Sequence, residues 1–161
     1  MKQTVITIPS DDQQFCCTRA LVTVKAKADQ HPKWRSFLRG CTLQTNEAIR
    51  LHVAASVLLG PCGPAELRQF MAHASMRDYH LIVVDADRAY SCFKYGTGPT
   101  PLALLFWDEH NDAITSLPGF FGRSYFSGTG LKGVNNLEHH YCGDDANLYR
   151  KCSQGGFPIT R

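Results

Sequence analysis

Three kinds of side chain that together can form a nucleophilic catalytic set occur in this chain. Cys16 and Cys17 lie at the predicted start of a helix, where unpaired N–H groups and the helix dipole favour a thiolate. His110 and Asp112 are two positions apart in a predicted extended segment, so their side chains point to the same face. A histidine oriented by a carboxylate is the base that a thiol nucleophile needs. The candidate set is Cys16, His110 and Asp112, and the competing interpretation is a buried core thiol with a solvated turn histidine.

The helices that would carry the thiol follow from the spacing of the apolar residues. Residues 16–28 repeat apolar side chains at helical intervals, directly after the helix-starting residues 10–12. Further helices are predicted over about 47–59 and 64–75, the latter starting at a proline. The last of these helices should bury three side chains against the sheet: Leu67, Phe70 and Met71.

Apolar runs mark the strands that would carry the base. Residues 102–107, LALLFW, are too apolar to be half exposed and predict a central buried strand, with a second buried strand over 79–84. Residues 108–111 are turn formers, and the strand resumes over 113–116. This pattern places His110 in the turn. A short edge strand is expected over 4–8.

The order of these elements, helices first and strands afterwards, indicates an α+β layer architecture. A chain of 161 residues can bury one core and little more. We therefore predict one α+β domain over residues 1–120, with N-terminal helices packed on a small, mostly antiparallel sheet. The glycine-rich residues 121–161 have few aliphatic side chains and predict an irregular tail.

Composition restricts the compartment and the class of partner. A net charge of +3 with interspersed signs gives no nucleic-acid footprint. No segment has the length and hydrophobicity of a signal sequence or a membrane span, so we expect a nuclear or cytoplasmic protein that is neither secreted nor in the membrane. Seven cysteines, an odd number at irregular spacing, fit reduced thiols.

The segment CCTRAL that starts at Cys16 resembles the Cys-x-x-Arg-Ala-Leu opening of the catalytic helix in OTU-type cysteine peptidases. The segment 104–112 is similar to the family's strand that ends in His-aromatic-Asn/Asp, with Asn111 in place of the aromatic residue. The resemblance covers about residues 10–118. It implies an OTU-like, papain-like fold with Cys16 as nucleophile, His110 as base and Asp112 as the orienting group.

One difference from that family lies just before the nucleophile. OTU-type peptidases usually have Asp-Gly-Asn there, in a loop that helps to stabilise the oxyanion. This chain has Gln13, Gln14 and Phe15 instead.

A second resemblance covers nearly the whole chain. The succession FCCTRALVTVKAKA, CGPAELRQFM, DYHLIVV, HNDAITSLPGFFGRSYF and LKGVNNLEHH is similar to the N-terminal region of protein-primed family B DNA polymerases from Polinton or Maverick elements and adintovirus-like relatives. It implies that the chain is the N-terminal part of such a polymerase, an OTU-like accessory domain without a polymerase active site, which would meet DNA through the parent protein.

That second family also carries zinc-type motifs after the phenylalanine pair: a Cys-x-x-Cys, a His-x-Cys and another Cys-x-x-Cys. Here Ser127 and Gly130 replace the first pair. Structural zinc takes four ligands, and the resemblance leaves only three: His140, Cys142 and Cys152. We predict a degenerate, empty zinc-ribbon-like segment that packs loosely after Phe126, and no cofactor.

Two alternative functions stay open. One is a free cysteine peptidase acting on ubiquitin-like conjugates, and the other is an inactive nucleic-acid or protein binding module. Asp85 and Asp87 follow a buried strand as turn residues and lack the further carboxylates that a two-metal polymerase site needs. The glycines between 128 and 133 lack the phosphate-loop pattern.

Overall fold

The computed structural model describes residues 4–9, 15–39, 42–60, 62–128, 130–134 and 148–150. Its helices are α1 (Cys16–Ala28), α2 (Trp34–Leu38), α3 (Thr42–Ala55), α4 (Pro64–Ala72) and α5 (Leu117–Phe120), with 3₁₀ turns η1 (Ala74–Met76) and η2 (Ala86–Arg88). Its strands are β1 (Val5–Ile6), β2 (Tyr79–Asp85), β3 (Ser91–Tyr95), β4 (Thr100–Trp107), β5 (His110–Ile114), β6 (Tyr125–Ser127), β7 (Lys132–Val134) and β8 (Leu148–Arg150).

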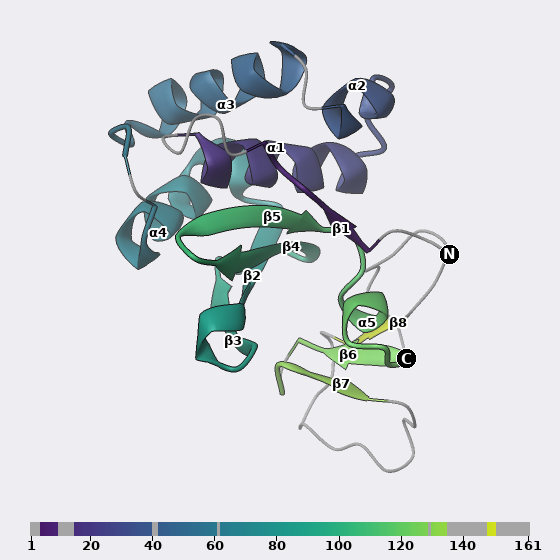
Figure 1. Cartoon of the computed structure of the whole chain (residues 1–161). Helices are drawn as coiled ribbons and strands as arrows, with labels where there is room; N and C mark the ends of the chain where they lie inside the picture. Colours follow the sequence, from purple (N-terminus) through teal and green to yellow (C-terminus); the bar gives the residue numbers. More distant parts are fainter. Residues whose placement is uncertain are drawn as a thin grey trace.

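A five-stranded sheet in the order β1-β5-β4-β2-β3 divides the molecule. In the view of Figure 1, helices α1, α2 and α3 lie above it, α4 lies beside it at the left, and α5 and a second sheet lie below it. Strands β2 and β4 are parallel, and the other three pairs are antiparallel. The apolar run that begins at Leu102 thus forms the middle strand of the sheet. The predicted mixed α+β class, with helices packed on a mostly antiparallel sheet, is confirmed.

Helix α1 packs directly on β4 and β5 and forms the centre of the main core. Its buried side chains include Ala20 and Leu21, which share one apolar cluster with Leu104 of β4 and Ala113 of β5. Burying a Leu-sized side chain contributes about 1.5–3 kcal/mol, so this cluster is the main source of stability in the helical layer.

A buried polar network joins the first three helices. Arg19 donates from Nε to Gln44 Oε1 at 2.7 Å, and the Gln44 amide donates to the backbone oxygen of Phe37 and to Thr23 Oγ1. Arg19 and Gln44 are both buried. Because a buried guanidinium is costly without partners, this network fixes how α2 and α3 pack on α1.

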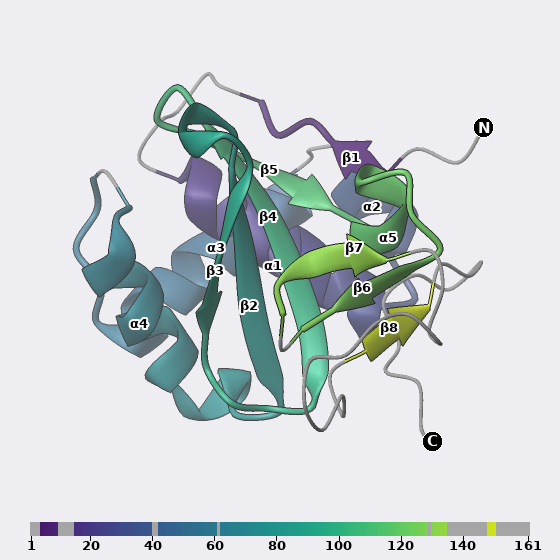
Figure 2. The same cartoon turned by 90° about the horizontal axis from the view of Figure 1, so that it is seen from below.

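The opposite face of the large sheet carries a smaller core. Ile82, Ala103 and Ile114 pack there against Leu117 of α5 and Phe126 of β6. Strand β6 is the middle strand of a three-stranded sheet in the order β7-β6-β8, which lies close to α5 in both views (Figures 1 and 2). Phe126 is fully buried, so the start of the predicted tail docks on the main domain.

Several predicted boundaries need correction. Helix α3 begins at Thr42 and ends at Ala55, earlier at both ends than predicted, and α4 ends at Ala72 before a 3₁₀ turn. The prediction that residues 121–161 form an irregular tail is wrong for β6, β7 and β8, because backbone pairing joins these three short strands in a small sheet. Burial of Leu67, Phe70 and Met71 on α4 is confirmed.

The turn between β4 and β5 is shorter than predicted. Asp108 and Glu109 both have positive φ, and Trp107 pairs with His110 across the strands. Positive φ at both central residues is the mark of the two-residue hairpin turn whose twist matches its strands. His110 is therefore the first residue of β5 and is not in the turn, so the strand's alternation governs where its side chain points.

Candidate active site at the start of strand β5

Asp112 is the fixed centre of a small hydrogen-bonded group. Its Oδ1 accepts from His110 Nε2 at 2.8 Å and from the backbone N–H of Ile8 at 2.7 Å, and its Oδ2 accepts from Trp107 Nε1 at 2.9 Å. The Asp112 and His110 side chains are 5% and 11% exposed. The predicted pairing of His110 with Asp112 is thus present, and it is shielded from solvent.

The hydrogen bond to Asp112 determines which ring nitrogen of His110 carries the proton. The carboxylate accepts, so Nε2 carries the proton, and in the neutral ring Nδ1 is the basic nitrogen. The ring also packs edge-on against Trp107, with centroids 5.6 Å apart. Asp112 and Trp107 thus both contact the His110 ring. The pair therefore has the form of an oriented general base.

Trp107 is a member of this group that sequence reasoning missed. Its indole holds the second oxygen of Asp112, and its ring supports the imidazole. The available signal was the pair of residues on either side of a two-residue turn, since these lie opposite each other in a hairpin.

Cys16 is the first residue of α1, as predicted, and it is buried in the helical-layer core. The start of α1 lies above the β4–β5 turn in Figure 1, so Cys16 and His110 are at the same end of the molecule. The chain brings the three predicted residues to one end of the sheet.

The alternation of β5 decides which of its side chains face α1. Ala113 belongs to the core on the α1 side, and Ile114 belongs to the core on the other side. Counting back along the strand, Asn111 shares the α1 face with Ala113, while His110 and Asp112 share the face of Ile114. Across the hairpin, Phe106 packs on the α1 side, and Trp107 alternates to the other.

Asn111 has an unusual environment for an amide. The residue is 3% exposed, and no hydrogen bond to its side chain is found among the residues that the structure describes. A buried amide without a partner costs about 1–3 kcal/mol. It lies on the α1 face of β5, so its amide faces the helical layer that contains Cys16.

Cys17, the second candidate thiol, has a different neighbour. The interaction with the Cys62 side chain, which precedes α4, and burial both raise the pKa of the Cys17 thiol. Successive helical residues are about 100° apart around the axis, so Cys16 and Cys17 have different surroundings. A thiol with a raised pKa is a weak nucleophile at neutral pH.

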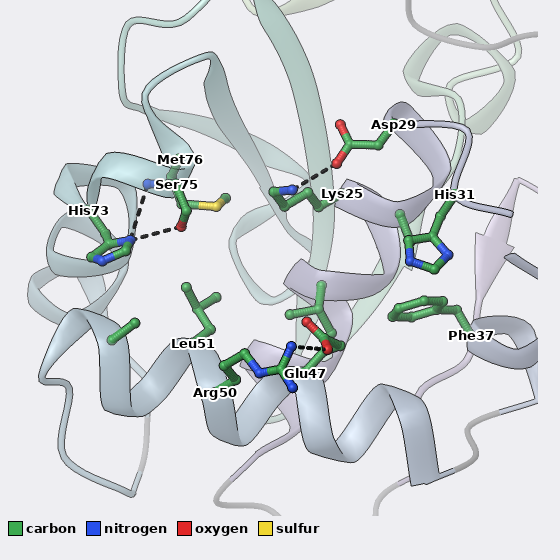
Figure 3. Close-up of a pocket in the computed structure, with 13 residues that line it drawn as sticks. Lys25, Asp29, His31, Phe37, Glu47, Arg50, Leu51, His73, Ser75 and Met76 are labelled. Atoms are coloured by element: carbon green, nitrogen blue, oxygen red, sulfur yellow. Dashed lines mark hydrogen bonds and ion pairs between the residues drawn. The ribbon is translucent and has the colours of Figure 1, made fainter. Parts of the chain in front are cut away.

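A separate pocket lies over the C-terminal half of α1. It has a volume of about 240 Å³ and an apolar floor that includes Val22, Leu51 and Met76. Its rim holds the ion pairs Lys25–Asp29 and Arg50–Glu47, as Figure 3 shows. Its volume is below the usual range of ligand sites, and it lies toward the end of α1 away from Cys16.

The predicted zinc ligands His140, Cys142 and Cys152 lie outside the described residues. Within the described ranges, no cluster of three metal-binding side chains occurs, and no helix is long and apolar enough to cross a membrane.

Comparison with known proteins adds no relative. No protein-family model matches the chain, and no significant match was found among curated proteins or among solved structures.

Proposed function

We propose that the chain is an OTU-like accessory domain from the N-terminal region of a protein-primed DNA polymerase of Polinton-type mobile elements. It copies no DNA itself and performs no hydrolysis. The motifs around Cys16 and His110 and the succession of segments along the chain support this family, and the mixed α+β arrangement agrees with it. DNA is then a partner of the parent polymerase.

The proposal that the chain performs no hydrolysis rests on one observation. His110 and Asp112 are on the face of β5 opposite to the α1 core that contains Cys16, by the alternation that separates Ala113 from Ile114. A general base must come within hydrogen-bonding distance of the proton that it removes. On the opposite face, His110 and Asp112 have a structural role. Together with Trp107 and the N–H of Ile8 they form a hydrogen-bonded group, here called the lock, that holds the segment after β1, the end of β4 and the start of β5 together.

The lock also explains the burial of Asp112. Strand β1 ends at Ile6, and the N–H of Ile8 then donates to the Asp112 carboxylate. Trp107 donates from the end of β4, and His110 from the start of β5. One carboxylate therefore satisfies three donors from three segments, which is a structural role complete without catalysis.

The parentage has its own test. Sequencing the genomic DNA downstream of Arg161 should reveal exonuclease and palm regions in the same reading frame. An immediate stop codon followed by unrelated sequence at every genomic copy would contradict it.

A second candidate is a cysteine peptidase acting on ubiquitin-like conjugates, with Cys16, His110 and Asp112 as its catalytic residues. The observation that favours it is the orientation of His110, whose Nε2 is held by Asp112 so that Nδ1 is the basic nitrogen. A ubiquitin-like substrate with a fluorogenic C-terminal group separates the two candidates. Release of the fluorophore that is lost in Cys16→Ala and kept in Cys17→Ala would establish the peptidase.

A further inference from the structure

The end of α1 and the short helix α2 hold an excess of positive charge. Residues 25–39 include five Lys or Arg side chains and one acidic residue, so this segment has a formal charge of +4. The rest of the chain, taken together, has one more acidic than basic residue. The mild net charge of +3 therefore averages over an uneven distribution, in which one short segment is strongly basic.

Local packing holds this segment together at one edge of the molecule. The His31 ring contacts Phe37 edge-on, with ring centroids 5.1 Å apart, and Lys27 Nζ lies 5.5 Å from the centre of the Trp34 ring. Phe37 is buried, so α2 is fixed against the end of α1. In both views α2 lies on the opposite side of the molecule from α4 (Figures 1 and 2).

Four of the five cations in this segment lack an acidic partner, and they form what is here called the basic surface: Lys27, Lys33, Arg35 and Arg39. No ion pair joins any of the four to a carboxylate in the ranges that the structure describes. All of them are exposed except the first, which is half-buried over Trp34. The fifth cation, Lys25, is paired with Asp29 at 2.7 Å. An external anion can therefore bind the basic surface without first breaking an internal ion pair.

The side chains of the basic surface fit a single nucleic-acid strand. Two of them are Arg, whose planar guanidinium donates to phosphate oxygens in pairs. The half-buried Trp34 ring lies among the cations, and an aromatic ring beside cations can stack on the unpaired bases of a single strand. A membrane surface fits less well, because α2 has five residues and buries Phe37, so it lacks a long apolar face to insert into lipid.

We propose that the basic surface binds the phosphate backbone of single-stranded DNA, with Trp34 stacking on one base. The charges and the ring point to a single nucleic-acid strand, and the choice of DNA rests on the proposed function. There DNA is a partner of the parent polymerase, whereas here this chain itself contacts the strand. Because the contacts are with phosphates, the binding is independent of base sequence and falls steeply with salt.

Fluorescence anisotropy of a labelled oligo-dT of about 20 nucleotides, titrated with the whole chain, tests the proposal. We expect a micromolar Kd at about 20 mM salt and a slope of about −3 for log K against log salt, since each phosphate contact contributes about −0.7. Removing two contacts in the double variant Arg35→Gln, Arg39→Gln should reduce the slope to about −1.5 and weaken binding about tenfold or more. The matched control is Arg68→Gln, Arg77→Gln, which removes two exposed arginines on and after α4 and should change both quantities far less.

Tryptophan fluorescence reports the base contact separately. The chain has two tryptophans, Trp34 and Trp107, and the second lies at the end of β4, away from the basic surface. Oligo-dT should quench the tryptophan emission of the wild type, because a stacked base lies against the Trp34 ring. Trp34→Phe keeps an aromatic ring in the same place and should remove most of this quenching while the anisotropy change persists.

Three results would overturn the proposal. The first is a wild type that does not bind oligo-dT at low salt, and the second is an equal loss of affinity in both double variants, which would show a response to net charge alone. The third is binding to phosphatidylserine vesicles without binding to oligo-dT, which would identify a lipid surface instead. Because the salt dependence is measured on the wild type, the proposal is tested even if a variant folds poorly. None of these results bears on the parentage, which the downstream reading frame tests.

Discussion

Ala113 and Ile114 are neighbours in β5, yet each packs in a different core, one under α1 and the other against α5 and β6. This division assigns every side chain of the strand to a face. His110 and Asp112 are on the face of Ile114, and Asn111 is on the face of Ala113. The motif that resembles a catalytic strand therefore presents its amide, and not its imidazole, to the layer that holds Cys16.

Asp112→Asn should weaken the fold. The amide replaces one accepting oxygen by an NH₂ group, which then faces an N–H of Ile8, Trp107 or His110. We expect a loss of about 1–3 kcal/mol in the free energy of unfolding, measured by urea titration. Glu109→Gln, in the exposed turn of the same hairpin, is the matched control and should change stability by less than about 0.5 kcal/mol. Equal effects of the two substitutions would refute the lock.

Asn111→Val should stabilise the protein. It removes a buried amide without a described partner and adds a β-branched apolar side chain to a strand, for a gain of about 1–2 kcal/mol. Asn111→Asp is the opposite control, because it buries a charge at the same place and should destabilise. Thermal unfolding of the three proteins measures the difference, and a lower melting temperature for Asn111→Val would show that the amide has a stabilising partner.

Gly98 should not tolerate a side chain. A Cβ there would lie 2.1 Å from the backbone nitrogen of Tyr79 and 2.2 Å from the carbonyl carbon of Asp78, both main-chain atoms that cannot rotate away. We expect Gly98→Ala to cost more than about 3 kcal/mol. Gly122→Ala is the comparison: its φ is +64° with open space around the Cβ, so only the backbone term of about 1–2 kcal/mol applies. Denaturant titrations of both variants give the difference.

His80 should make stability depend on pH. Burial lowers its pKa below the usual histidine value of about 6.5, although the bond to the Gly98 carbonyl oxygen opposes this. Below pH 6.5 the unfolded chain takes up a proton that the folded chain does not, so stability falls as the pH drops from 7 toward the lowered pKa. His80→Gln should flatten this part of the pH profile of the urea midpoint. An unchanged slope would assign the pH dependence to other groups.

Much of the helical layer could be predicted because its signals are local. The periodicity after Cys16 gave the full extent of α1, and Pro64 marked the start of α4, whose buried face was also correct. The apolar run from Leu102 likewise identified the central strand. In each of these elements, the apolar residues whose spacing predicts the helix or strand are also the residues that are buried.

The candidate site was harder to predict because lengthening or shortening a turn by one residue moves every side chain of the following strand to the opposite face of the sheet. A turn over 108–111 left the orientation of His110 open, whereas the two-residue turn at Asp108 and Glu109 places His110 within β5. The spacing of His110 and Asp112 correctly predicted their contact, since it does not depend on register. Which layer they face does depend on it, and the sequence holds no signal for that choice.

The alkylation rate of Cys16 as a function of pH, in the wild type and in His110→Ala, tests the central claim most directly. Iodoacetamide labelling followed by peptide mass spectrometry measures each cysteine separately, with Cys17 and Cys92 as internal references. The account predicts that His110→Ala leaves the Cys16 rate unchanged at every pH, because the imidazole is on the other face of the sheet. A decrease of about tenfold or more at neutral pH in His110→Ala, confined to Cys16, would contradict it and establish a catalytic pair.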